Sequence, residues 1–223
     1  ADFVLHKKHK GFNDPRGGGH ASGRLTLCLV AAGVIAKKII QPISIEAALI
    51  EAGGKKNIDQ AIEEALKAKD SIGGIIECCA TNMPIGLGEP FFESLESQIS
   101  QLVFSIPATK GIEFGSGFEA ANMSGSQHND ALIDKDGTTK TNHAGGINGG
   151  ISNGNPLIFR VAIKPTSSTA QQQESINLAS NQLEQFTVQG RHDVCIALRA
   201  PVVIEAATAI ALADAYLRHK ALT

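Results

Sequence analysis

The sequence predicts one domain that mixes helices with strands, and three observations lead to this. A chain of 223 residues is long enough to bury a substantial single core. Its composition, 43% hydrophobic and 19% charged, is typical of a globular domain. Along the chain, long apolar segments rich in helix-forming residues are followed by short segments in which every second residue is apolar. We therefore expect a single domain over residues 1–223.

The first two elements are a helix and a strand. Residues 24–40 are apolar on most faces, end in Lys37 and Lys38, which suit the helix dipole, and stop before Pro42. This pattern predicts a buried helix. Residues 44–51 alternate in polarity and reach a Gly-Gly pair, which predicts a strand followed by a turn.

A second helix and a second strand come next. Asp59 is expected to cap the helix, and Glu63 and Lys67 have the i,i+4 spacing of a stabilising ion pair. The helical pattern ends near Asp70. The apolar run over residues 72–80 then predicts a strand.

The remaining chain alternates in the same way. We expect a helix over residues 91–104, a long polar loop over 124–154, a strand over 156–164, a strand ending at 187–190 and a helix over 201–217. A polar loop as long as the predicted one is uncommon in a compact domain and is usually functional.

The stretch "TNHAGGINGGISNG" at residues 141–154 lies in that loop and allows two interpretations. It resembles a flexible linker in its glycine content, yet Ile147 and Ile151 recur at a fixed interval between glycine pairs. Alternatively, the glycines let the main chain approach a ligand where a Cβ atom would collide. The local sequence leaves both open.

Charge and cysteine content exclude several classes of function. A formal net charge of -2 gives no electrostatic basis for binding nucleic acid, and no apolar run is long enough to cross a bilayer. We expect a cytoplasmic protein with a small-molecule partner. Without a CxxC pair, Cys28, Cys78, Cys79 and Cys195 are expected to be buried thiols.

The histidines and one glycine motif give no further cofactor site. His128, His143 and His192 form no pair at i,i+4 spacing, so we expect no metal. The motif "GSGFEA" at residues 115–120 resembles a dinucleotide fingerprint, but no strand-helix-strand unit surrounds it.

Two polar segments suit an anion. Glycines at residues 17–19 precede the first predicted helix, whose N-terminus would gather unpaired N–H groups. Lys164 is followed closely by the hydroxyls of Thr166, Ser167 and Ser168, a donor set suited to phosphate. Each segment taken alone could equally be an ordinary turn.

The order of the motifs adds a resemblance that covers nearly the whole chain. The motifs are "RGGG", "SGRLT", "DSIGGIIE", "PIGLGEPFF", "SIPATKGIEFGSGF", "GSQHND", "TNHAGGINGGISNG", "KPTSS", "GRHD" and "RAPVVIEA". In this order they resemble the chorismate synthase family.

The resemblance implies a fold, a reaction and partners. The fold would be α+β, a β-α-β sandwich with helices packed between antiparallel sheets. The reaction would be the 1,4-elimination of phosphate from 5-enolpyruvylshikimate 3-phosphate, giving chorismate for aromatic amino acid biosynthesis. It would need reduced FMN, kept reduced by a flavin reductase or an external reductant, in a homotetramer.

The resemblance also implies residue roles. Asp193 would be the general base beside flavin N5, and Arg24 would bind substrate. The implied cofactor-binding residues are Ser22, Pro107, Ala108, Asn129, Gly149, Lys164, Pro165, Thr166, Ser167, Ser168 and Arg191.

The sequence departs from the family pattern at three places, one of which is Val194, where the family motif "GRHDP" has a proline. Side-chain roles are not carried over to His20 and Ala21, where the family motif differs. The family's N-terminal region, with its catalytic histidines, would precede Ala1, so we expect the domain to lack it. This leaves a second function open: an incomplete or non-catalytic relative that retains flavin binding and subunit assembly.

Overall fold

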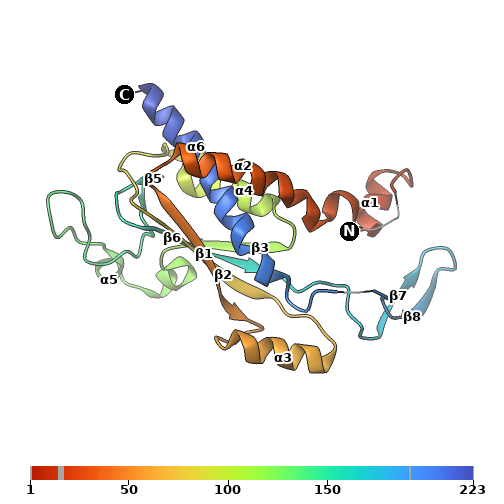
Figure 1. The fold of residues 1–223 in the computed structure, drawn as a ribbon. Coiled ribbons are helices and arrows are strands. Elements are labelled where there is room, and N and C mark those ends of the chain that lie inside the picture. Colours follow the sequence, from red (N-terminus) through yellow and green to blue (C-terminus); the bar gives the residue numbers. More distant parts are fainter. Residues whose placement is uncertain (1, 15–17, 191, 223) are drawn as a thin grey trace.

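The protein has an α+β fold built on one four-stranded antiparallel sheet, with helices packed against one face (Figure 1). The computed structural model describes residues 2–14, 18–190 and 192–222. In spatial order the strands are β1 (Ser44–Ala52), β2 (Gly74–Thr81), β6 (Leu157–Ile163) and β3 (Thr109–Phe114). The strands predicted over residues 44–51, 72–80 and 156–164 are confirmed.

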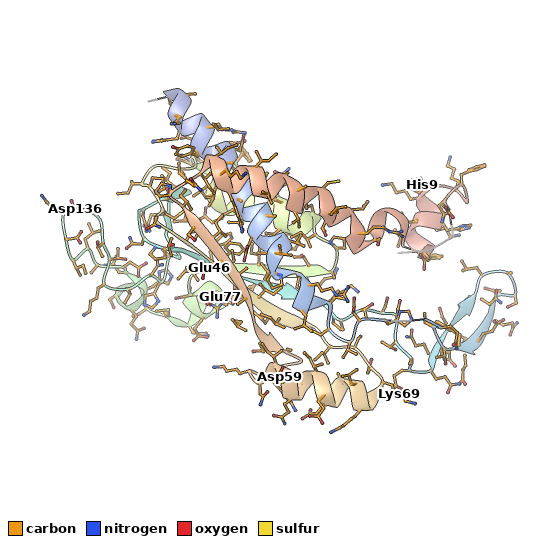
Figure 2. All side chains as sticks on the ribbon, in the orientation of Figure 1. His9, Glu46, Asp59, Lys69, Glu77 and Asp136 are labelled. Carbon is orange, nitrogen blue, oxygen red and sulfur yellow. The ribbon has the colours of Figure 1, made fainter. Side chains whose placement is uncertain are left out.

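Side chains alternate between the two faces of the sheet, as the strand period requires. The face toward the helices carries buried residues such as Cys78 on β2 and Phe159 on β6, and the Phe159 ring lies 5.5 Å from that of Phe114. Burial raises the pKa of Cys78 to about 12. The other face carries Glu46 and Glu77 on neighbouring strands (Figure 2).

Three helices form the layer over the sheet: α2 (Thr26–Ile39), α4 (Leu95–Ser105) and α6 (Pro201–Leu222). Leu95, Ile99 and Val103 of α4 are buried at i,i+4 spacing, which gives this helix one core-facing stripe. The helices predicted over residues 91–104 and 201–217 are therefore confirmed, although α4 begins four residues later than expected.

Helix α2 corrects the prediction of a buried helix. Only Gly33 and Ala36 are buried within it, while the side chains of Leu27 and Ile35 are 74% and 64% exposed. Cys28, predicted to be buried, is also exposed. The reason is that α2 contacts α6 through small residues: a Cβ atom on Gly33 would lie 2.4 Å from the Cβ of Ala206. Apolar composition alone does not tell which face of a helix finds a partner.

A charged contact ties this helix layer to the sheet. Glu205 of α6 accepts hydrogen bonds from the Lys37 ammonium of α2 at 2.5 Å and from the Ala47 backbone N–H of β1 at 2.9 Å. The Glu205 side chain is only 20% exposed, so both bonds are partly shielded from water.

Helix α3 (Ile58–Ala68) begins at a different cap from the one predicted. Asn57, not Asp59, is the N-cap residue, and its side chain accepts a hydrogen bond from the Gln60 N–H at 3.1 Å. Asp59 lies in the first turn, where its charge still suits the helix dipole. The predicted pair between Glu63 and Lys67 is present at 2.6 Å.

The remaining elements are short. They are α1 (Asp2–Lys8), α5 (Gly125–His128), the hairpin of β4 (Ile147–Asn148) and β5 (Ile151–Ser152), the hairpin of β7 (Gln173–Asn177) and β8 (Gln182–Phe186), and five 3-10 helices among the described residues. The β7–β8 hairpin projects from the body of the molecule (Figure 1). Strand β8 ends at Phe186, just before the range predicted for its end. The long polar loop is partly ordered by α5 and by β4–β5.

The other cysteines are closer to expectation. Cys78 and Cys195 are buried, and Cys79 is half-buried. Burial together with the nearby carboxylates of Glu77 and Glu46 raises the pKa of Cys79.

Candidate functional site

The "KPTSS" segment leaves the sheet directly after β6 and is fixed through its backbone. The Lys164 N–H donates to the Ala108 carbonyl at 2.9 Å, which brings together two of the predicted cofactor residues. Ala108 has a φ of 74°, an unusual value for a residue other than glycine. Farther along, the Thr166 carbonyl accepts a hydrogen bond from the Ser71 hydroxyl at 2.6 Å. The segment is thus held between β3 and the start of β2.

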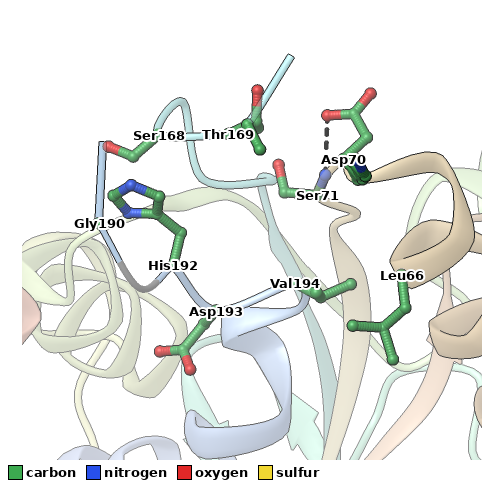
Figure 3. Close-up of a pocket in the computed structure, with 11 residues that line it drawn as sticks. Leu66, Asp70, Ser71, Ser168, Thr169, Gly190, His192, Asp193 and Val194 are labelled. Atoms are coloured by element: carbon green, nitrogen blue, oxygen red, sulfur yellow. Dashed lines mark hydrogen bonds between the residues drawn. The ribbon is translucent and has the colours of Figure 1, made fainter. Parts of the chain in front are cut away.

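A cavity of about 250 Å³ opens beside this segment (Figure 3). Its walls come from the carboxyl end of α3, from the chain after β6 and from the chain that precedes the 3-10 helix Ile196–Arg199. The lining residues are Leu66, Lys69, Asp70, Ser71, Ser168, Thr169, Ala170, Gly190, His192, Asp193 and Val194. Of the predicted site residues, Ser168 and Asp193 line this cavity.

Several lining residues are absent from the set that the sequence predicts. Lys69 lies at the carboxyl end of α3 (Figure 2), in a left-handed conformation with φ 54°, and Ser71 and Thr169 add hydroxyl groups. Asp70 and Ser71 open the motif "DSIGGIIE", so the sequence contained a signal for this wall although it assigned no role to it.

The neighbours His192 and Asp193 project in different directions. In Figure 3 the His192 ring lies on the side of Ser168, whereas the Asp193 carboxylate points away from Ser168 and Thr169. Asp193 instead pairs with the Arg199 guanidinium at 2.8 Å, and its side chain is 41% exposed. The Asp193 carboxylate is therefore accessible from solvent.

Ser22 and Arg24, predicted to bind cofactor and substrate, meet at the start of α2. The Ser22 hydroxyl caps the 3-10 helix Gly23–Leu25 and lies 3.2 Å from Arg24 Nε. Arg24 is exposed, so its guanidinium is accessible to an oxyanion. Arg191, another predicted cofactor residue, lies outside the described residues.

Asn129 and Gly149 lie at the other end of the sheet. Asn129 follows α5, and Gly149 occupies the turn between β4 and β5. The glycine-rich stretch contacts the first residues of β6, because the Ile158 N–H donates to the Gly145 carbonyl. Lys164, in contrast, follows the last residue of β6. A strand of seven residues spans about 20 Å, so Asn129 and Gly149 form a cluster separate from that of Ala108 and Lys164.

The glycine-rich stretch around Gly149 is mostly packed against its own chain. A Cβ atom on Gly145 would lie 2.5 Å from the Gly115 nitrogen, and one on Gly146 would lie 2.5 Å from the Pro156 oxygen. Gly149 and Gly150 have φ values of 60° and 86°, which suit a two-residue hairpin turn. Only at Gly149, within this stretch, would an added Cβ meet nothing within 4 Å. Most of these glycines therefore allow close packing of the chain against itself, rather than forming a flexible linker or facing a ligand along the whole stretch.

The motifs "GSQHND" and "TNHAGG" come together at this end. The Asp130 carboxylate accepts hydrogen bonds from the Thr141 hydroxyl and from the N–H groups of His143 and Ala144, at 2.7 to 2.9 Å. Burial would raise the pKa of Asp130, but these bonds, led by that of Ala144, outweigh it and lower the pKa. The rings of His128 and His143 are 5.6 Å apart.

Two general findings concern the described part of the chain. It contains no group of three or more His, Cys, Asp or Glu side chains placed to hold a metal ion. No helix within it has the length and apolar character needed to cross a membrane.

Together, the fold and the site define an α+β protein with a small cavity at one end of its sheet. The chain belongs to the chorismate synthase family, whose model matches residues 1–217. A chorismate synthase from Chitinophaga pinensis is 63% identical over 215 residues, and one from Korarchaeum cryptofilum is 43% identical over 249 aligned positions. These matches cover 96% and 98% of this chain, and the chain spans 65% and 69% of the lengths of those two proteins.

A solved structure gives the same result for the fold. A crystal structure of chorismate synthase matches with a TM-score of 0.80 and 28% identity, over 97% of this chain and 70% of the other. The α+β fold implied by the sequence motifs is therefore confirmed.

Proposed function

We propose that this protein is a chorismate synthase, a lyase that eliminates phosphate from 5-enolpyruvylshikimate 3-phosphate with reduced FMN as its cofactor. The observation that carries the proposal is the 63% identity to a chorismate synthase over 96% of the chain. One domain over residues 1–223, a homotetramer, an external source of reduced flavin and a cytoplasmic location belong to the same proposal.

The residues around the cavity fit part of FMN. A volume of about 250 Å³ lies below the roughly 300 to 1,000 Å³ of pockets that enclose a whole ligand of this size. Lys69 and the hydroxyls of Ser168 and Thr169 suit a phosphate group and the polyol chain next to it. The rest of the flavin would extend beyond the cavity.

Bound reduced FMN would supply an electron to the substrate and recover it, so that no net oxidation occurs. Within this scheme Lys164 and Arg191 bind the flavin, and Arg24 binds an oxyanion of the substrate. Asp193 holds or accepts a proton, and its pairing with Arg199 orients the carboxylate for this role.

The function is tested by measuring chorismate formation under anaerobic conditions with substrate and chemically reduced FMN. Turnover supports the proposed activity. Binding of FMN without any turnover would favour the non-catalytic relative, and the absence of both would contradict the two functions together.

The cofactor residues are tested by the affinity for FMN. Removing a charge-assisted hydrogen bond costs about 1.5 to 3 kcal/mol, so Lys164→Ala and Arg191→Ala should each weaken FMN binding roughly ten- to a hundredfold. Lys140→Ala, which removes an exposed lysine at the other end of the sheet, is the matched control. Unchanged affinity in both test variants would contradict the assignment.

A further inference from the structure

His192 carries a buried polar atom with no partner. Its Nε2 has no hydrogen bond to any described residue, although a buried imidazole nitrogen normally finds one. The ring packs over Gly190, where an added Cβ would lie 3.4 Å from Nε2. Leaving such an atom unsatisfied costs free energy, so its retention calls for an explanation such as a ligand.

Several hydrogen-bond donors line the cavity around this ring. Lys69, Ser168 and Thr169 line it with His192, and the ring lies on the side of Ser168 (Figure 3). Of the two lining carboxylates, Asp70 accepts the Ser71 N–H at 2.8 Å and Asp193 pairs with Arg199. A ligand that offers only acceptor oxygens is the complement of this wall.

We propose that His192 donates a hydrogen bond from Nε2 to an oxygen of a phosphate group bound in this cavity. The assignment rests on the proposed function for the source of the phosphate, the FMN phosphomonoester. A phosphate accepts from several donors at once, and it satisfies Nε2 together with the ammonium and hydroxyl groups that line the cavity. His192 is thus a ligand-binding residue beyond those assigned above.

The first test compares FMN with riboflavin, which lacks the phosphate. His192→Phe retains a ring of similar size but removes the donor, and His192→Gln restores one. We expect His192→Phe to weaken FMN binding about tenfold and to leave riboflavin binding within about twofold, with His192→Gln close to the wild type. His9→Ala, an exposed histidine that does not line the cavity, should change neither affinity.

Two outcomes would overturn the assignment in this test. Unchanged FMN affinity in His192→Phe would show that Nε2 makes no contact with the ligand. Equal weakening of FMN and riboflavin would place the effect on the fold or on another part of the flavin.

The second test uses wild-type protein, so it does not depend on a variant that folds. The imidazole resonances of His192, identified by their loss in His192→Phe or His192→Gln, are followed by NMR as inorganic phosphate is added. A saturable shift supports the phosphate contact even if FMN does not bind, an outcome that would reject only the proposed function. If neither FMN nor phosphate shifts these resonances, the proposal for His192 is wrong.

Discussion

The two ends of strand β6 carry similar polar sequences but use them differently. Before β6, the Asp130 carboxylate and the amides of the glycine-rich stretch bond to one another, and Gly145 and Gly146 pack against their own backbone. After β6, the "KPTSS" segment leads to a cavity in which His192 Nε2 has no partner among the described residues. The first end is satisfied internally, whereas the second has bonding capacity to offer a ligand.

This difference between the two ends of β6 shows that an unusual amino-acid composition does not by itself mark a ligand site. Glycine and asparagine make the stretch at residues 141–154 the most conspicuous in the sequence, yet most of its glycines allow close packing of the chain. The less conspicuous end contains the unpartnered Nε2 of His192. If the proposal for His192 holds, a buried polar atom without a partner is a better guide to the ligand site than glycine content.

The largest expected effect tests the catalytic assignment at the cavity end. Asp193→Asn keeps the shape of the side chain but cannot accept a proton, so turnover should fall by about 10² to 10⁴-fold. FMN affinity should change little. Single-turnover flavin spectra measure the rate, and Asp136→Asn, at the other end of the sheet, is the control (Figure 2). A near-normal rate for Asp193→Asn would remove this residue from the mechanism.

The next prediction tests whether the glycine-rich end is structural. In Gly146→Ala the new Cβ would meet the Pro156 oxygen at a residue with φ 85°, and strain with overpacking should cost about 3 kcal/mol or more. Gly149→Ala meets open space and should cost only about 1 kcal/mol for its conformation. Urea unfolding gives both values. Equal losses would show that packing does not explain these glycines.

The contribution of Asp130 to stability at the glycine-rich end should depend on pH. Asp130→Asn should lower the free energy of unfolding by about 1 to 3 kcal/mol at pH 7, because it replaces a charged acceptor of three bonds. Since the folded pKa is lowered, this contribution is fully present above the ordinary pKa of 3.8 and is lost as the pH falls through the folded pKa. Urea unfolding of both proteins from pH 7 to pH 3 measures it. A difference that does not shrink in acid would contradict the charge argument.

The smallest expected effect concerns the anchor of the cavity end. Ser71→Ala removes the bond to the Thr166 carbonyl and should cost about 1 kcal/mol of stability, with a slight loss of FMN affinity. Ser126→Ala removes an exposed hydroxyl of α5, whose hydrogen bond is the local one with the Ser124 hydroxyl, and serves as the control. If the two variants were equally stable, the Ser71 bond would not help to hold the "KPTSS" segment.

Much of the fold was predictable because strand and helix periods are local properties. The alternation around Ile45 places β1, and Pro201 opens α6, as expected. The exposure of Leu27 was not predictable, because it depends on which face of α2 meets α6. The sequence also did not predict that Asn57 rather than Asp59 caps α3, because both residue types favour the N-cap position.

The site was predictable as a set of motifs but not as an arrangement. Ser168 and Asp193 do line one cavity, whereas Asn129 and Gly149 lie at the opposite end of the sheet. Strand order decides which loops meet, and motif order along the chain does not encode it. The unpaired Nε2 of His192 could not be found from sequence, because it depends on atoms contributed by distant segments.

The tight contact between Gly33 and Ala206 also bears on hydrogen exchange. Amides of α6, buried against α2 and the sheet, should exchange only when the whole domain unfolds. The chain that carries Asp193 runs into α6, and the Val194 carbonyl is bonded to the Ile72 N–H at 2.8 Å. The opposite wall, at Ser168 and Thr169, continues into the exposed β7–β8 hairpin, whose amides should exchange quickly. One wall of the cavity should therefore exchange its amide hydrogens slowly and the other quickly. We expect the cavity to open by local motion of the wall that continues into the β7–β8 hairpin.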